Sequence, residues 1–366
     1  MRANKKSVIR VLAFGLAFLS WVLSASAQSS KEMVSLTKEE ILAGAKREGK
    51  LTFATAHEET TVPHLVNAFK KKFPFVSEVS FHSVSGIPAG QKELFELSAG
   101  KSNVDAFTPH SGFWSSYFKQ DLFGKYNIRA LAKAKQLEIP AEMIDDSDVV
   151  VWTSTNSSIL VYNKDLVPPD KVPTGWESCL DPYWKGKFAV DTKPNVFTWL
   201  ATRWGEEKVL DYAKKLKENQ PIWVRGNTGA LTRAVAGEIP LLCGTYNHTT
   251  QRQFKKDPNI PLRIVAPNPV GISFHEPFGI YGKAKNPHAA LLWIEFVASN
   301  EAQRIVESWD PGKAFFMVEG TLANKLMKGN EVSICTSNCR AREEKLMERI
   351  AVEAWGLPKV GATAPK

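Results

Sequence analysis

After its first 27 residues, the sequence has no apolar run long enough to cross a membrane. A spanning helix needs roughly 18–20 consecutive apolar residues, and the later apolar stretches are interrupted by charged or polar residues before they reach that length. We therefore expect the mature protein to be exported and not embedded in a membrane.

The sequence also lacks the local motifs of common enzyme and metal sites. It has no G-x-S-x-G elbow, no H-E-x-x-H pair and no phosphate-binding P-loop. Its four cysteines include no C-x-x-C pair, which is the spacing that structural zinc favours. These absences predict a protein that is not an enzyme, has no catalytic residues and carries no cofactor.

The N-terminus has the three parts of a secretory signal. Residues 1–10 are basic and contain no acid, residues 11–23 are apolar, and SASAQ supplies small residues at cleavage spacing. The apolar run is shorter than a membrane span, which favours cleavage after Ala27 over a retained anchor. We expect a signal peptide over residues 1–27 and a periplasmic mature protein.

Export to an oxidising compartment bears on the four cysteines, because even numbers there favour disulfides. Cys335 and Cys339 are four residues apart, close enough to bridge in a turn or at a frayed helix end. We predict that disulfide, and we expect Cys179 and Cys243 to be free and buried.

Length and charge describe an ordinary globular protein. About 340 mature residues suffice for two domains with sizeable cores. The formal net charge falls from +9 to +5 when the signal, with four basic and no acidic residues, is removed. Basic residues are scattered or lie on helix faces such as Lys70, Lys71 and Lys72, which favours solvated faces over a nucleic-acid patch. We expect a monomer with no nucleic-acid partner.

Apolar patterning predicts alternating strands and helices. Strand-like segments at residues 50–56, 77–86 and 104–112 alternate with helix-like segments at 61–74 and 92–100. The pattern restarts at residue 187, with a helix over 196–218 and a strand over 239–245. This predicts α/β units with mostly parallel sheets flanked by helices. The loops at the strand carboxyl ends should line a binding crevice.

Two extended segments should connect these units. One lies near residues 149–164, as two stretches about the polar TSTNSS, and the other near 272–284. They define a first lobe over residues 28–150, a second lobe over 151–272, and a return to the first lobe over 273–366. The C-terminal helices should fold back onto the first lobe. Two lobes joined by two crossings form a hinge architecture.

Five segments in this order and spacing resemble the periplasmic solute-binding proteins of ABC importers, in the branch that includes the ferric-iron binding proteins. The resemblance spans about residues 40–308 and is carried by ILAGAKREGKLTFATAHEE, LSAGKSNVDAFTPHSG, LVYNKDLVPPDKVPTGWESCLDPYWKGKFAVD, GALTRAVAGEIPLLCGTYNH and NPHAALLWIEFVASNEAQRIV. It implies a two-lobed type II (Venus flytrap) fold, a small ligand captured between the lobes by hinge closure, and delivery to a permease in the inner membrane. The same fold could instead serve a periplasmic sensor that partners a membrane kinase.

The loops after the predicted strands and at the second crossing supply the candidate ligand-binding residues. Hydroxyl residues and glycines before helices let backbone N–H groups bind an anion, although they are also ordinary N-caps. Arg225 could bind a carboxylate or phosphate, or form a surface salt bridge. The candidates are His57, Glu58, Thr60, Ser83, Ser85, Gly86, Thr108, His110, Ser111, Arg225, Asn227, Thr228, Tyr246, Asn247, His248, His275 and Glu276.

Tyr246 bears on whether the ligand is a metal. Ferric members of the family carry two adjacent tyrosines where this chain has Thr245, Tyr246 and Asn247, and losing one phenolate removes a charged ligand for a hard ion. We therefore predict a small organic anion, such as a carboxylate or phosphonate, that accepts a hydrogen bond from the Tyr246 hydroxyl. The alternative is ferric iron, another metal or a metal chelate, with His57 and Tyr246 as the first ligands.

Overall fold

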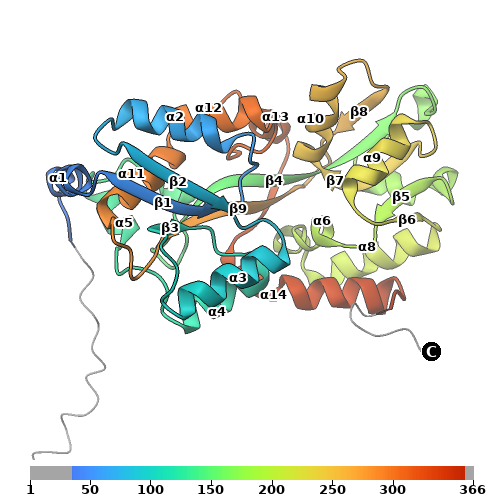
Figure 1. The fold of residues 1–366 in the computed structure, drawn as a ribbon. Helices are drawn as coiled ribbons and strands as arrows, with labels where there is room; N and C mark the ends of the chain where they lie inside the picture. The colour runs from blue at the N-terminus through green and yellow to red at the C-terminus, as the bar shows by residue number, and fades with distance from the viewer. Residues whose placement is uncertain (1–34, 359–366) are drawn as a thin grey trace, which may run out of the picture.

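The computed structural model describes residues 35–358, apart from the side chains of Asn338 and Ala341. The predicted signal peptide lies outside the described residues. Two α/β lobes lie end to end and are joined through the long strands β4 and β9, as Figure 1 shows. The two-lobed α/β architecture expected from the sequence is confirmed.

The first lobe is built around a short parallel sheet. Its core is rich in aromatic side chains, with Phe53 stacked on Trp293 at a centroid distance of 4.3 Å. Its elements are α1 (Lys38–Glu48), β1 (Lys50–Thr55), α2 (Val62–Lys72), β2 (Glu78–Ser83), α3 (Ile87–Ser98), β3 (Ala106–Phe107), α4 (Trp114–Lys119), α5 (Ile128–Lys133), α11 (Pro287–Ala298), α12 (Asn300–Trp309) and α13 (Leu322–Met327).

The second lobe repeats the plan with β5 parallel to β6 and β7. The helix predicted over 196–218 is divided into three. The break between α7 and α8 occurs at Gly205, whose φ is 77°. Its elements are β5 (Phe188–Asp191), α6 (Asn195–Thr198), α7 (Ala201–Trp204), α8 (Glu206–Glu218), β6 (Ile222–Val224), α9 (Asn227–Val235), β7 (Leu241–Tyr246), α10 (Asn247–Lys256) and β8 (Leu262–Val265).

Strands β4 (Val150–Asn163) and β9 (Val270–Ile280) connect the lobes as an antiparallel pair, with Val150 opposite Gly279 and Ser157 opposite Ile272. β4 is one continuous strand, and the TSTNSS segment, expected as a break between two stretches, is buried in its middle. The sheet order β2-β1-β3-β9-β4-β7-β5-β6 places this pair at the centre of the molecule.

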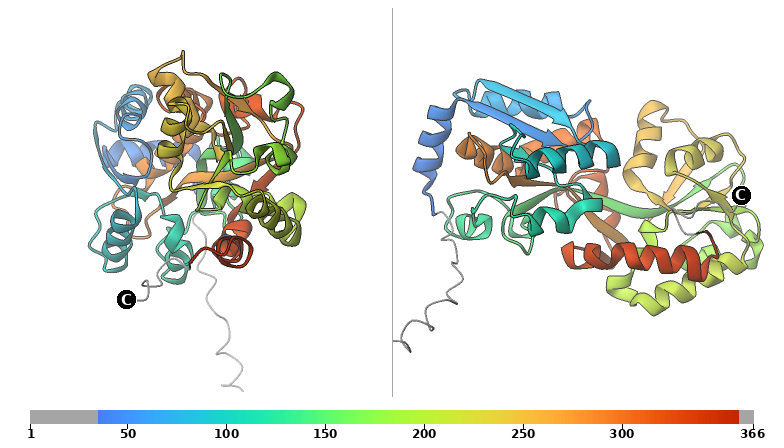
Figure 2. Two further views of the ribbon diagram at one scale, coloured as in Figure 1. Left: turned by 90° about the vertical axis from the view of Figure 1, so that its right-hand side faces the viewer. Right: turned by 60° about the horizontal axis from the view of Figure 1, so that its bottom comes forward.

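The C-terminal segment makes a third connection that the sequence did not predict. Strand β10 (Val332–Cys335) pairs with β9, and α14 (Ser337–Glu348) then continues into a π-helix, η6 (Arg349–Ala354). The expectation that the last helices pack on the first lobe is wrong for α14, because Leu346, Ile350 and Trp355 are buried in the core of the second lobe. Figure 2 shows α14 alongside α8.

Both cysteine pairs are bonded. Cys335 and Cys339 form the predicted disulfide, which joins the end of β10 to the first turn of α14. Cys179 and Cys243, expected to be free, form a second disulfide inside the second lobe. Their sequence separation of 64 gave no local signal for this pairing.

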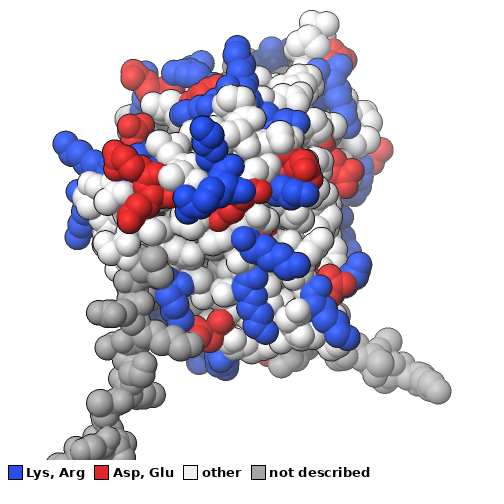
Figure 3. All heavy atoms as spheres, turned by 60° about the vertical axis from the view of Figure 1, so that its left-hand side comes forward, with Lys and Arg blue, Asp and Glu red and all other residues white. Residues whose placement is uncertain are grey.

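The surface carries both signs of charge. On the face in Figure 3, which brings the first lobe forward, Lys and Arg side chains are interspersed with Asp and Glu. Within residues 35–358, none of the helices is both long and apolar enough to span a bilayer.

Candidate functional site

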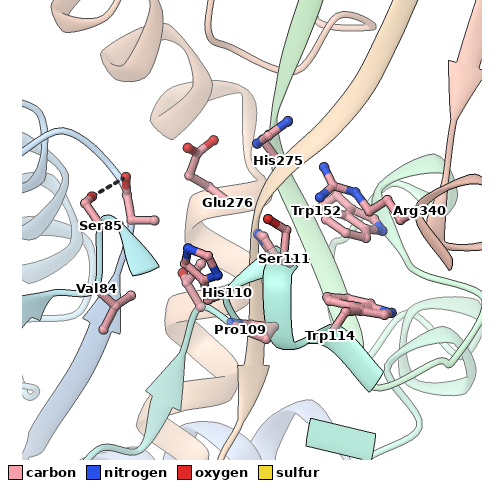
Figure 4. Close-up of a pocket in the computed structure, with 14 residues that line it drawn as sticks. Val84, Ser85, Pro109, His110, Ser111, Trp114, Trp152, His275, Glu276 and Arg340 are labelled. Carbon is pink, nitrogen blue, oxygen red and sulfur yellow. Dashed lines mark hydrogen bonds between the residues drawn. The ribbon is translucent and has the colours of Figure 1, made fainter. Parts of the chain in front are cut away.

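A cavity of about 240 Å³ opens beside the hinge, on the side of α3 and α14. Its wall comes from three sources: the segments after β1, β2 and β3 of the first lobe, the start of β4 with the middle of β9, and α14. Figure 4 shows Arg340 and Trp152 on one side of this pocket and Ser85 and Val84 on the other. Predicted first-lobe loops therefore do meet at one pocket.

The first-lobe wall supplies small polar groups. Ser85 and Gly86 lie directly before α3, whose first-turn N–H groups have no partners within the helix. Thr108 and Ser111 follow β3, and the Thr108 hydroxyl is buried without a hydrogen-bond partner among residues 35–358. His110 accepts a hydrogen bond at Nδ1 from the Gly112 N–H, and burial lowers its pKa. This wall can donate hydrogen bonds to an oxygen-rich ligand.

The hinge wall holds two metal-compatible donors from consecutive residues, His275 and Glu276. Successive side chains of a strand point to opposite faces, yet His275 and Glu276 both line the pocket. The reason is the backbone of Glu276, which has φ 43° and so interrupts the pleat of β9. A non-glycine residue in this left-handed region is strained, and such strain clusters at functional sites.

Glu276 is held by a buried cation. Its Oε1 lies 3.2 Å from Lys313 Nζ, which also donates to Asn156 Oδ1 at 2.6 Å. Its Oε2 is buried and has no hydrogen-bond partner among the described residues. Burial raises the pKa of Glu276 and lowers the pKa of His275 well below its usual value. The His275 imidazole is therefore neutral at pH 7, which is the form that binds metals.

Three residues that line the pocket, Arg340, Trp152 and Trp114, were not predicted from the sequence. Arg340 Cζ lies 5.0 Å from the centroid of the Trp152 ring. The Trp114 ring stacks on the Trp152 ring with a distance of 5.2 Å between their centroids. Arg340 Nη2 donates to Ser273 Oγ at 3.0 Å and to the Phe274 carbonyl. Trp152 was hidden in an apolar strand and Arg340 in a charged terminal helix, so no local pattern marked either residue as part of a site.

The first predicted loop lies outside this pocket, apart from Ala56. His57 is buried and its Nε2 is 3.1 Å from Thr153 Oγ1, while burial and Lys313 lower its pKa to about 4. Glu58 is exposed and pairs with Arg252 of the second lobe at 2.8 Å. Thr60 is exposed in a turn before α2, and Ser83 accepts a hydrogen bond from the Ser85 N–H.

None of the second-lobe candidates lines the pocket. Arg225 and Thr228 are exposed, and Asn227 donates to Asp191 at 3.1 Å, across the β5 and β6 ends. Tyr246 stacks between Trp199 at 5.5 Å and His248 at 5.6 Å.

Tyr246 ends its strand as a neutral phenol. Burial raises its pKa above the ordinary value, which opposes formation of a phenolate at neutral pH. Asn247 and His248 begin α10 and are buried, with Asn247 Nδ2 and His248 Nδ1 unpartnered among the described residues. The loop after β7 is therefore packed toward the interior rather than toward this pocket.

On the other side of the lobe interface, α10 of the second lobe contacts the first lobe through what we call the α10 cluster: Arg252, Lys255, Glu58, Trp309 and Asp310. Arg252 binds Asp310 through two hydrogen bonds of 2.7 Å. Lys255 donates to the carbonyls of Ser308 and Trp309. Figure 1 shows α10 beside α12 on the opposite side of the hinge strands from α14.

No three or more His, Cys, Asp or Glu side chains form a metal-binding group anywhere in residues 35–358. The pair His275 and Glu276 would need further donors from a ligand to complete a metal shell.

Residues 104–334 match the family model described as bacterial extracellular solute-binding protein, which is more than half of the chain. The chain belongs to this family. Solute-binding proteins of this kind are the binding components of ABC-type importers, so the resemblance inferred from the sequence is confirmed. The match ends before α14 and Arg340.

Three relatives of this solute-binding protein carry names that mention iron. Iron uptake protein A2 of Synechocystis is 25% identical over 253 residues, covering 62% of this chain and 69% of that protein. Iron-bound HitA from Pseudomonas aeruginosa has a TM-score of 0.62 and 16% identity, over 82% and 99% of the two chains. A Trichodesmium protein (IdiA, FutA) with iron and citrate ligands has a TM-score of 0.65 and 16% identity, over 84% and 100%. The predicted organic anion has no support among these relatives, which agree better with the iron alternative.

Proposed function

We propose that this solute-binding protein captures ferric iron as a complex with a small carboxylate anion in the pocket beside the hinge. It then delivers the complex from the periplasm to an ABC permease in the inner membrane, without chemistry on the ligand. The iron-named relatives support the metal, and the polar first-lobe wall supports an anion that accompanies it.

The observation that carries the proposal is the placement of His275 and Glu276 on one pocket wall. The left-handed backbone at Glu276 places this carboxylate and the neutral His275 imidazole in the lining of one pocket, and Glu276 Oε2 has no hydrogen-bond partner among the described residues. Hard cations favour oxygen ligands, and imidazole suits iron. A strained, buried carboxylate that keeps one oxygen unpaired is costly unless a ligand uses that oxygen.

The pocket favours a complex over a bare ion for two reasons. Among residues 35–358, no group of three or more acids, histidines or cysteines is placed to enclose a metal without other donors. The cavity of about 240 Å³ is also several times the roughly 30 Å³ that one water occupies in the liquid, so there is room for a small chelating anion. A citrate-like anion would fill the remaining positions around the iron.

Capture by closure requires that the closed state bind the complex more tightly than the open state. The pocket already combines first-lobe loops with α14, which packs on the second lobe. A ligand that bridges them would draw the lobes together. Small-angle scattering should show a smaller radius of gyration with ferric citrate than without it, and an unchanged radius at saturation would contradict closure.

Calorimetric titration tests the ligand directly. We expect ferric citrate to bind the wild-type protein at least about tenfold more tightly than citrate alone, a difference of about 1.4 kcal/mol. Equal affinities would overturn the iron proposal and favour an organic-anion receptor, the second candidate, which Arg340 and its aromatic neighbours support. Iron content and the ferric electron paramagnetic resonance signal of the complex give an independent readout.

A further inference from the structure

Arg340 is a half-buried cation that forms no ion pair with an acid among the described residues. Its Nε is shielded from solvent and has no hydrogen-bond partner among residues 35–358, and no ion pair of Arg340 occurs within that range. The other cations at the lobe interface differ, since Arg252 pairs with Asp310 and Lys313 pairs with Glu276. An unpaired interior charge is unfavourable unless a ligand supplies the opposite charge.

The three acids that act electrostatically on Arg340 each have another partner. Glu343 accepts hydrogen bonds from Asn195, Thr198 and Trp199. Asp145 accepts from the Trp152 indole at 3.1 Å and from the Ser337 hydroxyl. Glu276 pairs with Lys313. These three carboxylates make the surroundings of Arg340 less positive, yet none of them supplies the partner that its guanidinium lacks.

Arg340 is also held in one place. Its guanidinium lies over the Trp152 ring, and Nη2 is fixed by Ser273 and Phe274 of β9. The Cys335–Cys339 disulfide immediately precedes it, and Cys335 pairs in register with Ser273. A guanidinium held in this way loses little side-chain freedom when it binds a ligand.

We propose that Arg340 is an anion-binding residue of the pocket and that it binds a carboxylate of the ligand, with Trp152 and Trp114 as the adjoining apolar wall. Both N–H groups of Nη2 are engaged by Ser273 and Phe274, so Nη1 is the part of the guanidinium that would donate to the carboxylate. This inference rests on the proposed function, because the carboxylate belongs to the anion that we propose is bound together with the iron. Because the family match ends at residue 334, this contact is supplied by the segment beyond it.

Titration with citrate alone, in the absence of iron, tests this residue apart from the metal. The proteins to compare are the wild type, Arg340→Gln, Arg340→Lys and the matched control Arg342→Gln, which changes an exposed arginine on the same helix. We expect Arg340→Gln to weaken citrate binding by about 10–100-fold and Arg340→Lys by about tenfold, because lysine keeps the charge but not the planar donors. Arg342→Gln should stay within about twofold of the wild type.

Each outcome decides between the two proposals. If the wild type binds ferric citrate no more tightly than citrate, but Arg340→Gln still loses citrate binding, the iron proposal fails and the carboxylate contact stands. If Arg340→Gln binds citrate as the wild type does, the contact is overturned whatever the iron result. It is also overturned if the wild type does not bind citrate at millimolar concentration. Circular dichroism verifies that each variant is folded. If Arg340→Gln does not fold, the citrate affinity of Arg340→Lys replaces it as the test.

Discussion

On one side of the lobe interface, Arg252 of α10 forms ion pairs with Asp310 and Glu58 of the first lobe. On the other side, Arg340 of α14 lies against the Trp152 ring and forms no ion pair within residues 35–358. Both arginines belong to helices of the second lobe and both face the first lobe. Their surroundings differ in whether an acid lies close enough to balance the positive charge of the arginine. In the α10 cluster the protein supplies the opposite charge, and in the pocket we propose that a ligand does so.

This difference separates two roles of charged residues at the interface, holding the lobes together and binding a ligand. The amino-acid sequence alone does not distinguish them. The α10 cluster fixes the relative position of the lobes in the absence of any ligand, because its ion pairs are complete. The pocket keeps Glu276 Oε2 and Arg340 Nε without partners among the described residues, so its electrostatic energy improves when a complementary solute enters. The completed ion pairs thus lie on one side of the interface, and the proposed binding pocket lies on the other.

The largest effect is expected from Arg252→Ala. Asp310 is only 3% exposed, so removing Arg252 leaves a buried carboxylate without its two hydrogen bonds and should lower the free energy of unfolding by about 3 kcal/mol. Denaturant unfolding measures it. Glu58→Gln, which removes only the exposed partner of the same arginine, should cost no more than about 0.5 kcal/mol. Equal losses in both variants would contradict this account of the cluster.

Acid should weaken the fold through His57, which lies near the same cluster. Its folded pKa is about 4, below the unfolded value of about 6.5, so the unfolded state binds the proton first. Stability is therefore complete above about pH 6.5 and is lost as the pH falls toward 4, by about 3 kcal/mol for this one group.

The variant His57→Gln isolates this contribution from the other buried histidines. Unfolding free energies measured at pH 7 and pH 5 should differ less in the variant than in the wild type. An identical pH dependence in the two proteins would show that His57 is not buried in its neutral form.

Glu276→Gln should affect binding more than folding. The amide keeps the shape of the side chain but loses the charge that the metal uses, so the affinity for ferric citrate should fall about 30-fold, or about 2 kcal/mol. Citrate alone should bind within about threefold of the wild type, because its contact is Arg340. A parallel loss for both ligands would show that Glu276 maintains the pocket rather than contacting the metal.

The smallest effect is expected from Tyr246→Phe. Tyr246 ends β7 in the second lobe and does not line the pocket in this structure, so its hydroxyl reaches a ligand only when the lobes close. A loss of about fivefold in affinity corresponds to one ordinary hydrogen bond of about 1 kcal/mol. Tyr183→Phe, the same change elsewhere in the second lobe, is the control. Unchanged affinity would limit the site to the hinge, the first lobe and α14.

Much of the fold could be predicted because its signals are local. The strands at residues 50–55 and 241–246 and the helix at 62–72 follow directly from apolar periodicity, and the extended segments near 150 and 272 mark the crossings. Five first-lobe candidates line the pocket for the same reason, since the ends of parallel strands gather at one edge of a sheet: Ser85, Gly86, Thr108, His110 and Ser111.

What could not be predicted depends on contacts between distant residues. Arg340 enters the pocket because β10 pairs with β9 and α14 packs on the second lobe, and neither contact leaves a pattern in the helix itself. The pair of His275 and Glu276 depends on a left-handed backbone at a residue type that rarely adopts it, so strand alternation predicts opposite faces. Cys179 and Cys243 are joined only by the packing of the second lobe.

The β4–β9 ribbon runs through both lobes, so it acts as the pivot about which they rotate. Any rotation of one lobe against the other has to bend or twist this ribbon, and the pocket wall at Trp152, His275 and Glu276 lies on the ribbon itself, near its fulcrum. Atoms near a fulcrum travel short arcs, while the outer ends of the lobes travel long ones. A receptor docked on the outer surfaces could therefore sense a large displacement produced by a very small change in the width of the pocket.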